Sequence, residues 1–184
     1  MHVSVLVMIH PQHLQRRAND LAKTIEDLML PHREVYDEES EETRGYWDWY
    51  QIGGRWTGHF DGYDPEQDPQ NVETCPLCVG TGDRPDTNQP GCNGCGGKGQ
   101  RSKWPTDWAL HTGDLTTVRA LQALKESDRP EPTFACVSPG GEWSEQGWGI
   151  EGSPERPEWG KRFWATFIEP ADPTVLCVIV DCHC

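Results

Sequence analysis

Four cysteines, arranged as two closely spaced pairs, are the residues of this sequence best suited to chemistry. Cys75 and Cys78 form the first pair, and Cys92 and Cys95 form the second. Each pair opens the pattern C-x-x-C-x-G-x-G, and 13 residues separate the pairs. Two such turns, brought together by a hairpin, can surround one ion with four sulfurs in a tetrahedron. The pattern therefore predicts one structural zinc ion held by these four side chains.

Two other interpretations of these cysteines are a pair of disulfides and a catalytic zinc site. Disulfides need an oxidising compartment, whereas residues 1–10 have neither the basic start nor the cleavage site of a secretory signal peptide. We therefore expect reduced thiols and a cytoplasmic protein. A catalytic zinc ion needs an open coordination position, which a shell of four cysteines does not leave.

The two half-motifs, residues 75–82 and 92–99, resemble the cysteine-rich repeat of DnaJ-type chaperones. Those chaperones carry four repeats and bind two zinc ions, so two repeats imply one ion. The resemblance covers about 25 residues and does not extend to chaperone activity, because His10-Pro11 is followed by Gln12 where a J-domain has Asp.

The charge of the chain is strongly negative outside this segment. The 184 residues include 30 acidic and 16 basic side chains, a formal net charge of −14. Residues 75–103 have the opposite balance, with four basic and two acidic side chains. An acidic body repels nucleic-acid phosphates, so nucleic acid is expected to bind only through the insert. No apolar run approaches the roughly 20 residues that cross a bilayer, and we expect no membrane partner.

Hydrophobic patterns predict a mixed set of elements around the insert. Continuous apolar runs favour buried strands, and apolar residues at steps of three and four favour helices. An acidic loop is expected at residues 34–44, and Asp114 is expected to cap the second helix. We expect strands at residues 3–9, 46–52, 133–137 and 175–180, and a strand near Trp143 that forms a hairpin with residues 133–137. We expect helices between Pro11 and Pro31, over residues 115–124, and from Pro157 to Pro170.

This order predicts an α+β fold, a compact sheet with helices packed on it. A ferredoxin-like arrangement is the best-fitting candidate. The two most apolar strands, at the ends of the chain, should be neighbours in the centre of the sheet. Residues 1–74 and 104–184 should form the core domain, and residues 75–103 an inserted four-cysteine zinc finger.

Arg55 is a candidate ligand-binding residue because it follows Gly53-Gly54 and lies between tryptophans. A guanidinium held on an indole face can bind a carboxylate or phosphate. The competing interpretation is an ion pair between Arg55 and Asp48 that fixes the turn.

Asp181 and His183 form a second candidate site at the end of the last strand. An Asp/His pair can bind a metal or act as a base and the group that orients it. A plain chain terminus is the alternative. Possible further partners are His59 and His111, and a second metal held by Cys182, His183 and Cys184 is a weaker candidate.

Outside the insert the sequence resembles a family of small phage and prophage proteins of unknown function. Residues 47–58, WDWYQIGGRWTG, carry most of the likeness, and the strand Val3–Ile9 and the ending Val178–His183 add to it. The resemblance implies a phage setting and supplies no activity.

Three functions remain open from the sequence. The first is an accessory protein that binds a host or phage macromolecule, protein or nucleic acid, through the zinc hairpin and nearby aromatics such as Trp104, Trp108, Trp143 and Trp148. The second is an enzyme acting on a phosphorylated or nucleotide substrate with Asp48, Arg55, Asp181 and His183. The third is an acidic inhibitor of host defence that imitates DNA.

Overall fold

The computed structural model describes residues 1–17, 20–63, 68–86, 90–103, 111–147 and 156–184. The chain forms two compact units, of which the first joins Met1–Gly62 to Leu110–Cys184 and the second is Tyr63–Ala109. The second unit is therefore longer than the 29-residue finger of residues 75–103, because residues on both sides of the cysteines belong to it.

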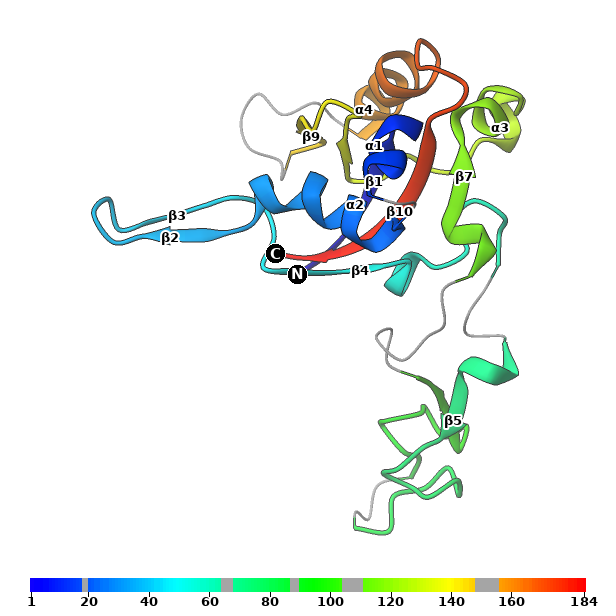
Figure 1. Cartoon of the computed structure of the whole chain (residues 1–184). Helices are drawn as coiled ribbons and strands as arrows, with labels where there is room; N and C mark the ends of the chain where they lie inside the picture. Colours follow the sequence, from blue (N-terminus) through cyan, green and yellow to red (C-terminus); the bar gives the residue numbers. More distant parts are fainter. Residues whose placement is uncertain (18–19, 64–67, 87–89, 104–110, 148–155) are drawn as a thin grey trace. The chain divides into compact units, whose positions relative to one another are not determined.

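A mixed sheet forms the centre of the first unit (Figure 1). Its central strands, β1 (His2–Ile9) and β10 (Leu176–His183), pair antiparallel along their whole length, as expected for the two most apolar segments. The strand order is β4-β10-β1-β8-β9, and β7 also pairs with β10. The shorter strands are β4 (Trp49–Ile52), β7 (Leu115–Thr117), β8 (Ala135–Val137) and β9 (Trp143–Glu145).

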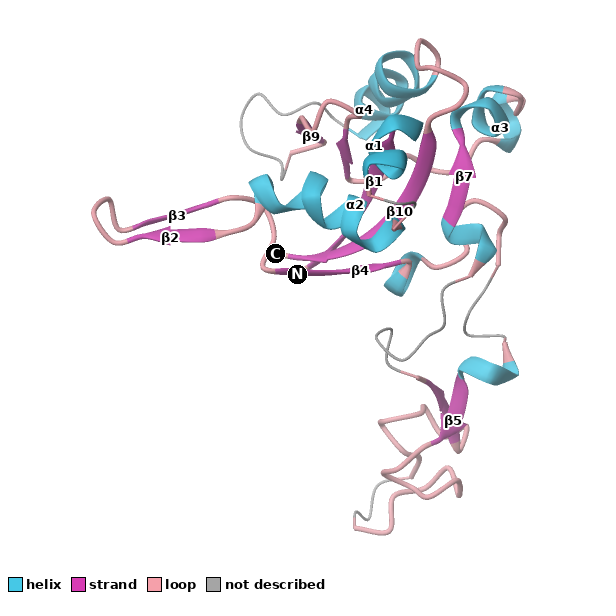
Figure 2. Cartoon of the chain, viewed as in Figure 1, coloured by secondary structure: helices cyan, strands magenta, loops and turns pink. Residues whose placement is uncertain are grey.

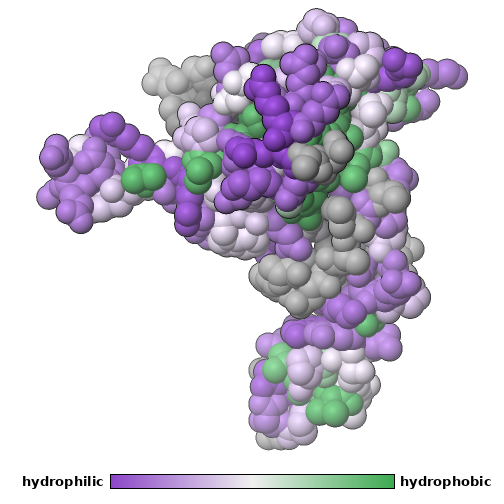
Figure 3. Space-filling model, in the orientation of Figure 1, coloured by the Kyte–Doolittle hydropathy of each residue, from purple (hydrophilic) through white to green (hydrophobic). Residues whose placement is uncertain are grey.

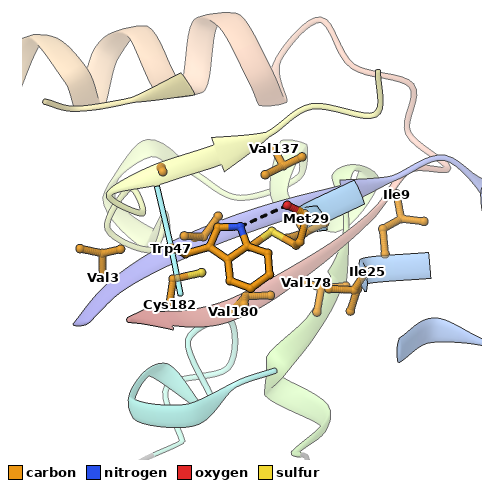
Figure 4. Packing of buried hydrophobic residues seen from close by; sticks show 12 residues of the cluster. Val3, Ile9, Ile25, Met29, Trp47, Val137, Val178, Val180 and Cys182 are labelled. Atoms are coloured by element: carbon orange, nitrogen blue, oxygen red, sulfur yellow. Dashed lines mark hydrogen bonds between the residues drawn. The ribbon is translucent and has the colours of Figure 1, made fainter. Parts of the chain in front are cut away.

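Helices cover both faces of this sheet, which explains why β1 and β10 are apolar on both sides (Figure 2). On one face, Val5 and Val180 pack against Ile25 and Met29 of α2 (Leu21–Met29), and the Trp47 indole donates a 3.1 Å hydrogen bond to the Met29 carbonyl (Figure 4). The other face packs on α3 (Val118–Gln122), α4 (Arg156–Phe163) and the π-helical turn Trp164–Ile168.

The α+β class is confirmed, and the ferredoxin-like arrangement is not. The β1–β8 pair is parallel, and the helices occupy both faces of the sheet. None of the helices in the described part of the chain is long and apolar enough to span a bilayer.

The single helix expected between Pro11 and Pro31 is wrong, because two helices occupy that segment. These are α1 (Pro11–Arg16) and α2. The Asp20 side chain accepts a 3.0 Å hydrogen bond from the Lys23 N–H and so begins a new helix within one continuous apolar stripe.

The acidic loop expected at residues 34–44 is also wrong, since this segment is a β-hairpin. Its strands are β2 (Val35–Asp37) and β3 (Glu42–Arg44), and its surface is largely hydrophilic (Figure 3). The hairpin between β8 and β9 is confirmed.

The second unit contains a short hairpin and the four cysteines. β5 (Val72–Thr74) pairs antiparallel with β6 (Gln100–Ser102), which brings together the chain entering and leaving the cysteine segment. This pairing is the scaffold on which the two C-x-x-C turns meet.

Candidate metal centre and the Asp–His end of the sheet

The four cysteine sulfurs converge to the geometry of a single metal ion. Their Sγ atoms all lie within 4.8 Å of one another, and the Cys75–Cys92 and Cys78–Cys95 separations are both 3.7 Å. Four sulfurs placed tetrahedrally at about 2.3 Å from zinc are about 3.8 Å apart. A disulfide would bring two sulfurs to about 2.05 Å, and all four cysteines are free thiols. The arrangement fits one ion and leaves no coordination position for water.

The two half-motifs are related by an internal two-fold pattern of hydrogen bonds. The Cys75 N–H donates to the Gly99 carbonyl at 2.9 Å, and the Cys92 N–H donates to the Gly82 carbonyl at 2.7 Å. The first cysteine of each half is thus tied to the second glycine of the other half. This exchange explains why both halves keep the same glycine offsets.

The glycines are required where the two halves cross. A Cβ on Gly82 would overlap the Gly97 carbonyl oxygen, and one on Gly99 would overlap the Gly80 carbonyl oxygen. The φ angles of 83° and 73° at Gly82 and Gly99 are also ones that side-chain-bearing residues rarely adopt. Any larger residue would push the two halves, and with them the sulfurs, apart.

Main-chain N–H groups around the sulfurs favour thiolates. The Gly99 N–H donates to the Cys95 Sγ at 3.2 Å. Burial raises the pKa of Cys78, but hydrogen bonds from the main chain of Gly82 and Gly80 outweigh that effect and lower its pKa to about 7. Thiolate is the form that binds metals, so the backbone favours the metal-binding form at Cys78, whereas burial raises the pKa of Cys92 to about 11.

In the first unit, His183 pairs with Asp48 at the end of the sheet. The His183 Nδ1 lies 2.8 Å from the Asp48 carboxylate, and its ring stacks on Trp49 with centroids 5.7 Å apart. Burial raises the pKa of Asp48, but the hydrogen bonds from His183 and the Trp49 N–H outweigh it and lower the pKa. Both members of the pair are substantially exposed, so we expect the pair to add little stability.

Asp181 is fully buried beside that pair and binds different groups. Its Oδ1 lies 2.8 Å from the Nδ1 of His2, and its Oδ2 accepts the Arg55 N–H at 3.0 Å. The structure therefore brings Asp181 to the main chain of Arg55, whose side chain is exposed. Gly54 must be a glycine because a Cβ there would overlap the Asp181 side chain.

Asp114 is a second buried carboxylate that binds the main chain of the same turn, so its expected role as a helix cap is wrong. Its Oδ1 accepts the Thr57 hydroxyl at 2.6 Å and the Gly58 N–H at 2.7 Å, and its Oδ2 accepts the His111 N–H at 2.9 Å. The α3 helix is capped instead by the Thr117 hydroxyl. The motif G-G-R-W-T-G is thus explained by two carboxylates that hold its main chain.

A cavity of about 770 Å³ opens at this end of the sheet. It is lined by residues 1–4, Trp56, His59, residues 130–132, Phe134, Gln146 and Trp159. His2 is the link between this cavity and the candidate residues, because its ring contacts Asp181 and lies 5.3 Å from that of His183.

Sequence reasoning missed His2, although it selected Asp181 and His183. The strand register places His2 opposite His183 and Ser4 opposite Asp181, a pairing of the two chain ends that no local pattern encodes. His59 lies in the cavity wall, and His111 lies 3.5 Å from Asp61. Cys182 is buried, and within the described ranges only the four finger cysteines form a group that could hold a metal.

The tryptophans fall into two groups. Trp47, Trp159 and Trp164 are buried in the core, whereas Trp143 of β9 is half-buried and stacks on Tyr46 with centroids 4.8 Å apart. The expected contact residues Trp104, Trp108 and Trp148 lie outside the described residues.

Comparison with known proteins adds no relative to this picture: no family model, curated protein or solved structure matches the chain.

Proposed function

We propose that this chain is a phage- or prophage-encoded accessory protein that holds one zinc ion in its hairpin and binds another protein through that hairpin. The observation that carries the proposal is the convergence of four buried sulfurs at tetrahedral separations. A tetrahedron of four thiolates is typical of structural zinc. Zinc has no redox chemistry and no geometric preference from its d electrons, so it accepts the tetrahedron that the four cysteines form.

The binding surface that we assign is the apolar tip formed by Leu77 and Val79. Leu77 and Val79 are 42% and 75% exposed, so Val79 in particular gains little from the fold of its own chain. Two exposed apolar residues on a rigid metal-fixed turn suit a contact with an apolar partner surface.

Backbone strain at Val79 supports this assignment. Val79 has φ 50°, and its counterpart in the second half-motif is Gly96 with φ 58°. A β-branched residue in this left-handed region is destabilised by about 1–2 kcal/mol. A strained and exposed valine where glycine fits the fold better is consistent with selection for contact.

The charges of the hairpin favour a protein partner over nucleic acid. Arg84 pairs with Asp86, and Arg101 lies 2.8 Å from Glu73, so two of its basic side chains are already neutralised. Binding to phosphates depends on several unpaired cations. The segment is therefore less suited to nucleic acid than its formal charge indicates.

The phage setting rests on the motif of residues 47–58 and the ending Asp181-Cys182-His183. It predicts that the reading frame lies among structural or early genes of a phage or prophage. A location among housekeeping genes would contradict it.

The test is capture of a partner from host lysate by the zinc-loaded full chain, with Val79→Gly as the informative variant. This substitution relieves strain and keeps every sulfur, so zinc content should be unchanged while capture falls at least about tenfold, equivalent to 1.4 kcal/mol. Val35→Gly is the matched control, because Val35 is 64% exposed on the β2–β3 hairpin of the other unit.

Two outcomes would overturn the proposal. One is a partner captured equally by the Val79→Gly variant and the unaltered protein. The other is capture that nuclease treatment abolishes and Lys98→Gln weakens, which would show that the hairpin binds nucleic acid.

A further inference from the structure

The cavity of the first unit contains a histidine whose orientation is fixed by a buried carboxylate. Asp181 has no exposed surface, and it binds His2 and the Arg55 N–H through different oxygens. His2 itself lines the cavity. In many binding and catalytic sites a buried carboxylate orients a histidine in this way. The carboxylate fixes one ring nitrogen, so the other nitrogen meets the ligand in a defined protonation state.

The hydrogen bond determines which nitrogen of His2 is available. A carboxylate only accepts hydrogen bonds, so the His2 Nδ1 must carry the proton that lies between it and Asp181. In the neutral ring, Nε2 then has a lone pair and accepts a hydrogen bond. In that form His2 offers the cavity an acceptor suited to an O–H or N–H group.

The walls of the cavity disfavour anions. Among the described residues, no Lys or Arg lines it, and Glu131 adds a negative charge. The ammonium group of Met1, which also lines it, already donates a hydrogen bond to the Cys184 carbonyl. Burial lowers the pKa of His59 and so disfavours a charged imidazole there, against the smaller effects of its hydrogen bond to the Glu131 main chain and of the Glu131 charge. A phosphate placed here would lose water and would meet the Glu131 charge, and the one ammonium in the described lining is already hydrogen-bonded, so the transfer is unfavourable.

The remaining walls suit a flat ring. The Trp56 side chain is half-buried at the cavity, and Trp159, only 1% exposed, closes its floor with its indole N–H bound to the Thr133 carbonyl at 2.8 Å. A volume of about 770 Å³ lies within the usual range of small-molecule sites.

We propose that this cavity binds an uncharged planar heterocycle of nucleoside size, with its ring against Trp56 and an O–H or N–H group donating to the Nε2 of His2. Each described residue that lines the cavity belongs to the first unit. The proposed site also differs from the enzyme expected from the sequence, because the ligand is not phosphorylated and Arg55 does not line the cavity.

The experiment titrates the zinc-loaded full chain with each common ribonucleoside and with its 5′-monophosphate, following histidine and tryptophan side-chain signals by NMR. We expect at least one nucleoside to bind saturably, with a dissociation constant below about 1 mM, and to shift the signals of His2 and Trp56. The matching monophosphate should bind at least about tenfold more weakly because of its charge.

The variants identify the site. His2→Gln should weaken nucleoside binding at least about tenfold, a factor typical of one lost hydrogen bond, while His13→Gln on α1 should leave it unchanged. Trp56→Leu should weaken binding as well, and it decides the question if the His2 variant does not fold. Failure of every nucleoside to saturate, equal binding of the monophosphate, or equal binding by the His2 and Trp56 variants would overturn the proposal.

Asp181 acts in this proposal as a positioning residue. In the unaltered protein the ¹⁵N chemical shifts of His2 should report a protonated Nδ1 and a bare Nε2. Asp181→Asn should change that tautomer and weaken binding in a chain that still folds. An unchanged His2 spectrum in this variant would contradict the positioning role.

Discussion

At the scale of single residues, two buried carboxylates explain the most distinctive stretch of the sequence. Asp114 and Asp181 each accept main-chain N–H groups from the turn after β4, and their side chains occupy the space beside Gly53 and Gly54. The motif was visible in the sequence. Its cause was not, because Asp114 lies 56 residues beyond the Gly58 N–H that it accepts and Asp181 lies 126 residues beyond the Arg55 N–H.

Asp114→Asn should destabilise the first unit by about 2–4 kcal/mol, because the amide presents hydrogens to donors and leaves the buried Gly58 or His111 N–H without an acceptor. The measurement is urea unfolding of the full chain followed by fluorescence. Asp128→Asn is the control, since Asp128 is exposed and should change stability by less than about 0.5 kcal/mol. Equal midpoints for the two variants would show that Asp114 is not a structural acceptor.

The pKa of His59 predicts a pH dependence of the first unit. Burial lowers this pKa below the ordinary value of 6.5 that the unfolded chain retains. As the pH falls below 6.5, protons bind the unfolded state first, so stability decreases until the folded His59 also protonates.

His59→Gln should remove this loss, and the measurement is the urea midpoint of the β1 and β10 amide signals at pH 7 and about pH 5.5. Comparing the same two pH values in both proteins cancels the contributions of other groups. A variant that loses as much stability as the unaltered protein between these pH values would contradict the assignment.

At the scale of elements, segments marked by residue spacing or by continuous apolar character were predictable, and segments without such a signal were not. The C-x-x-C turns, the β8–β9 hairpin and the terminal strands were all predictable because spacing or continuous apolar character specifies them. The break between α1 and α2 was not, because the apolar stripe runs through it. Asp20 was a signal that could have located it. The β2–β3 hairpin has no apolar alternation, so its pairing left no pattern to detect.

The crossing glycines of the four-cysteine hairpin provide a test at this scale. Gly99→Ala should lower zinc affinity at least about tenfold, because the new methyl group would overlap the Gly80 carbonyl and push the two halves apart. Gly91→Ala is a matched control, since Gly91 has a similar φ of 82° and no atom near its added Cβ. Competition with a zinc chelator measures both affinities, and equal values would contradict the crossing geometry.

At the scale of the whole molecule, the two units of the chain have separate sources of stability. The first unit has two apolar clusters, one on each face of its sheet. The second has only the four buried cysteines as its cluster among the described residues. With so small a core, this unit is expected to depend on the proposed metal ion for folding.

Removing the metal with a chelator should therefore unfold the second unit and leave the first folded. Hydrogen exchange should become fast for amides of β5 and β6 and stay slow for those of β1 and β10, and added zinc should reverse the change. Loss of protection in both units together would show that the first unit is not self-sufficient.

The central claim, that Cys75, Cys78, Cys92 and Cys95 hold one zinc ion, is tested most directly by zinc X-ray absorption on the purified chain with the metal content measured alongside. The account predicts one zinc per chain with four sulfur neighbours at about 2.3 Å, retained in Cys184→Ser and lost in Cys75→Ser. Absence of stoichiometric zinc, or a shell containing nitrogen or oxygen ligands, would contradict it.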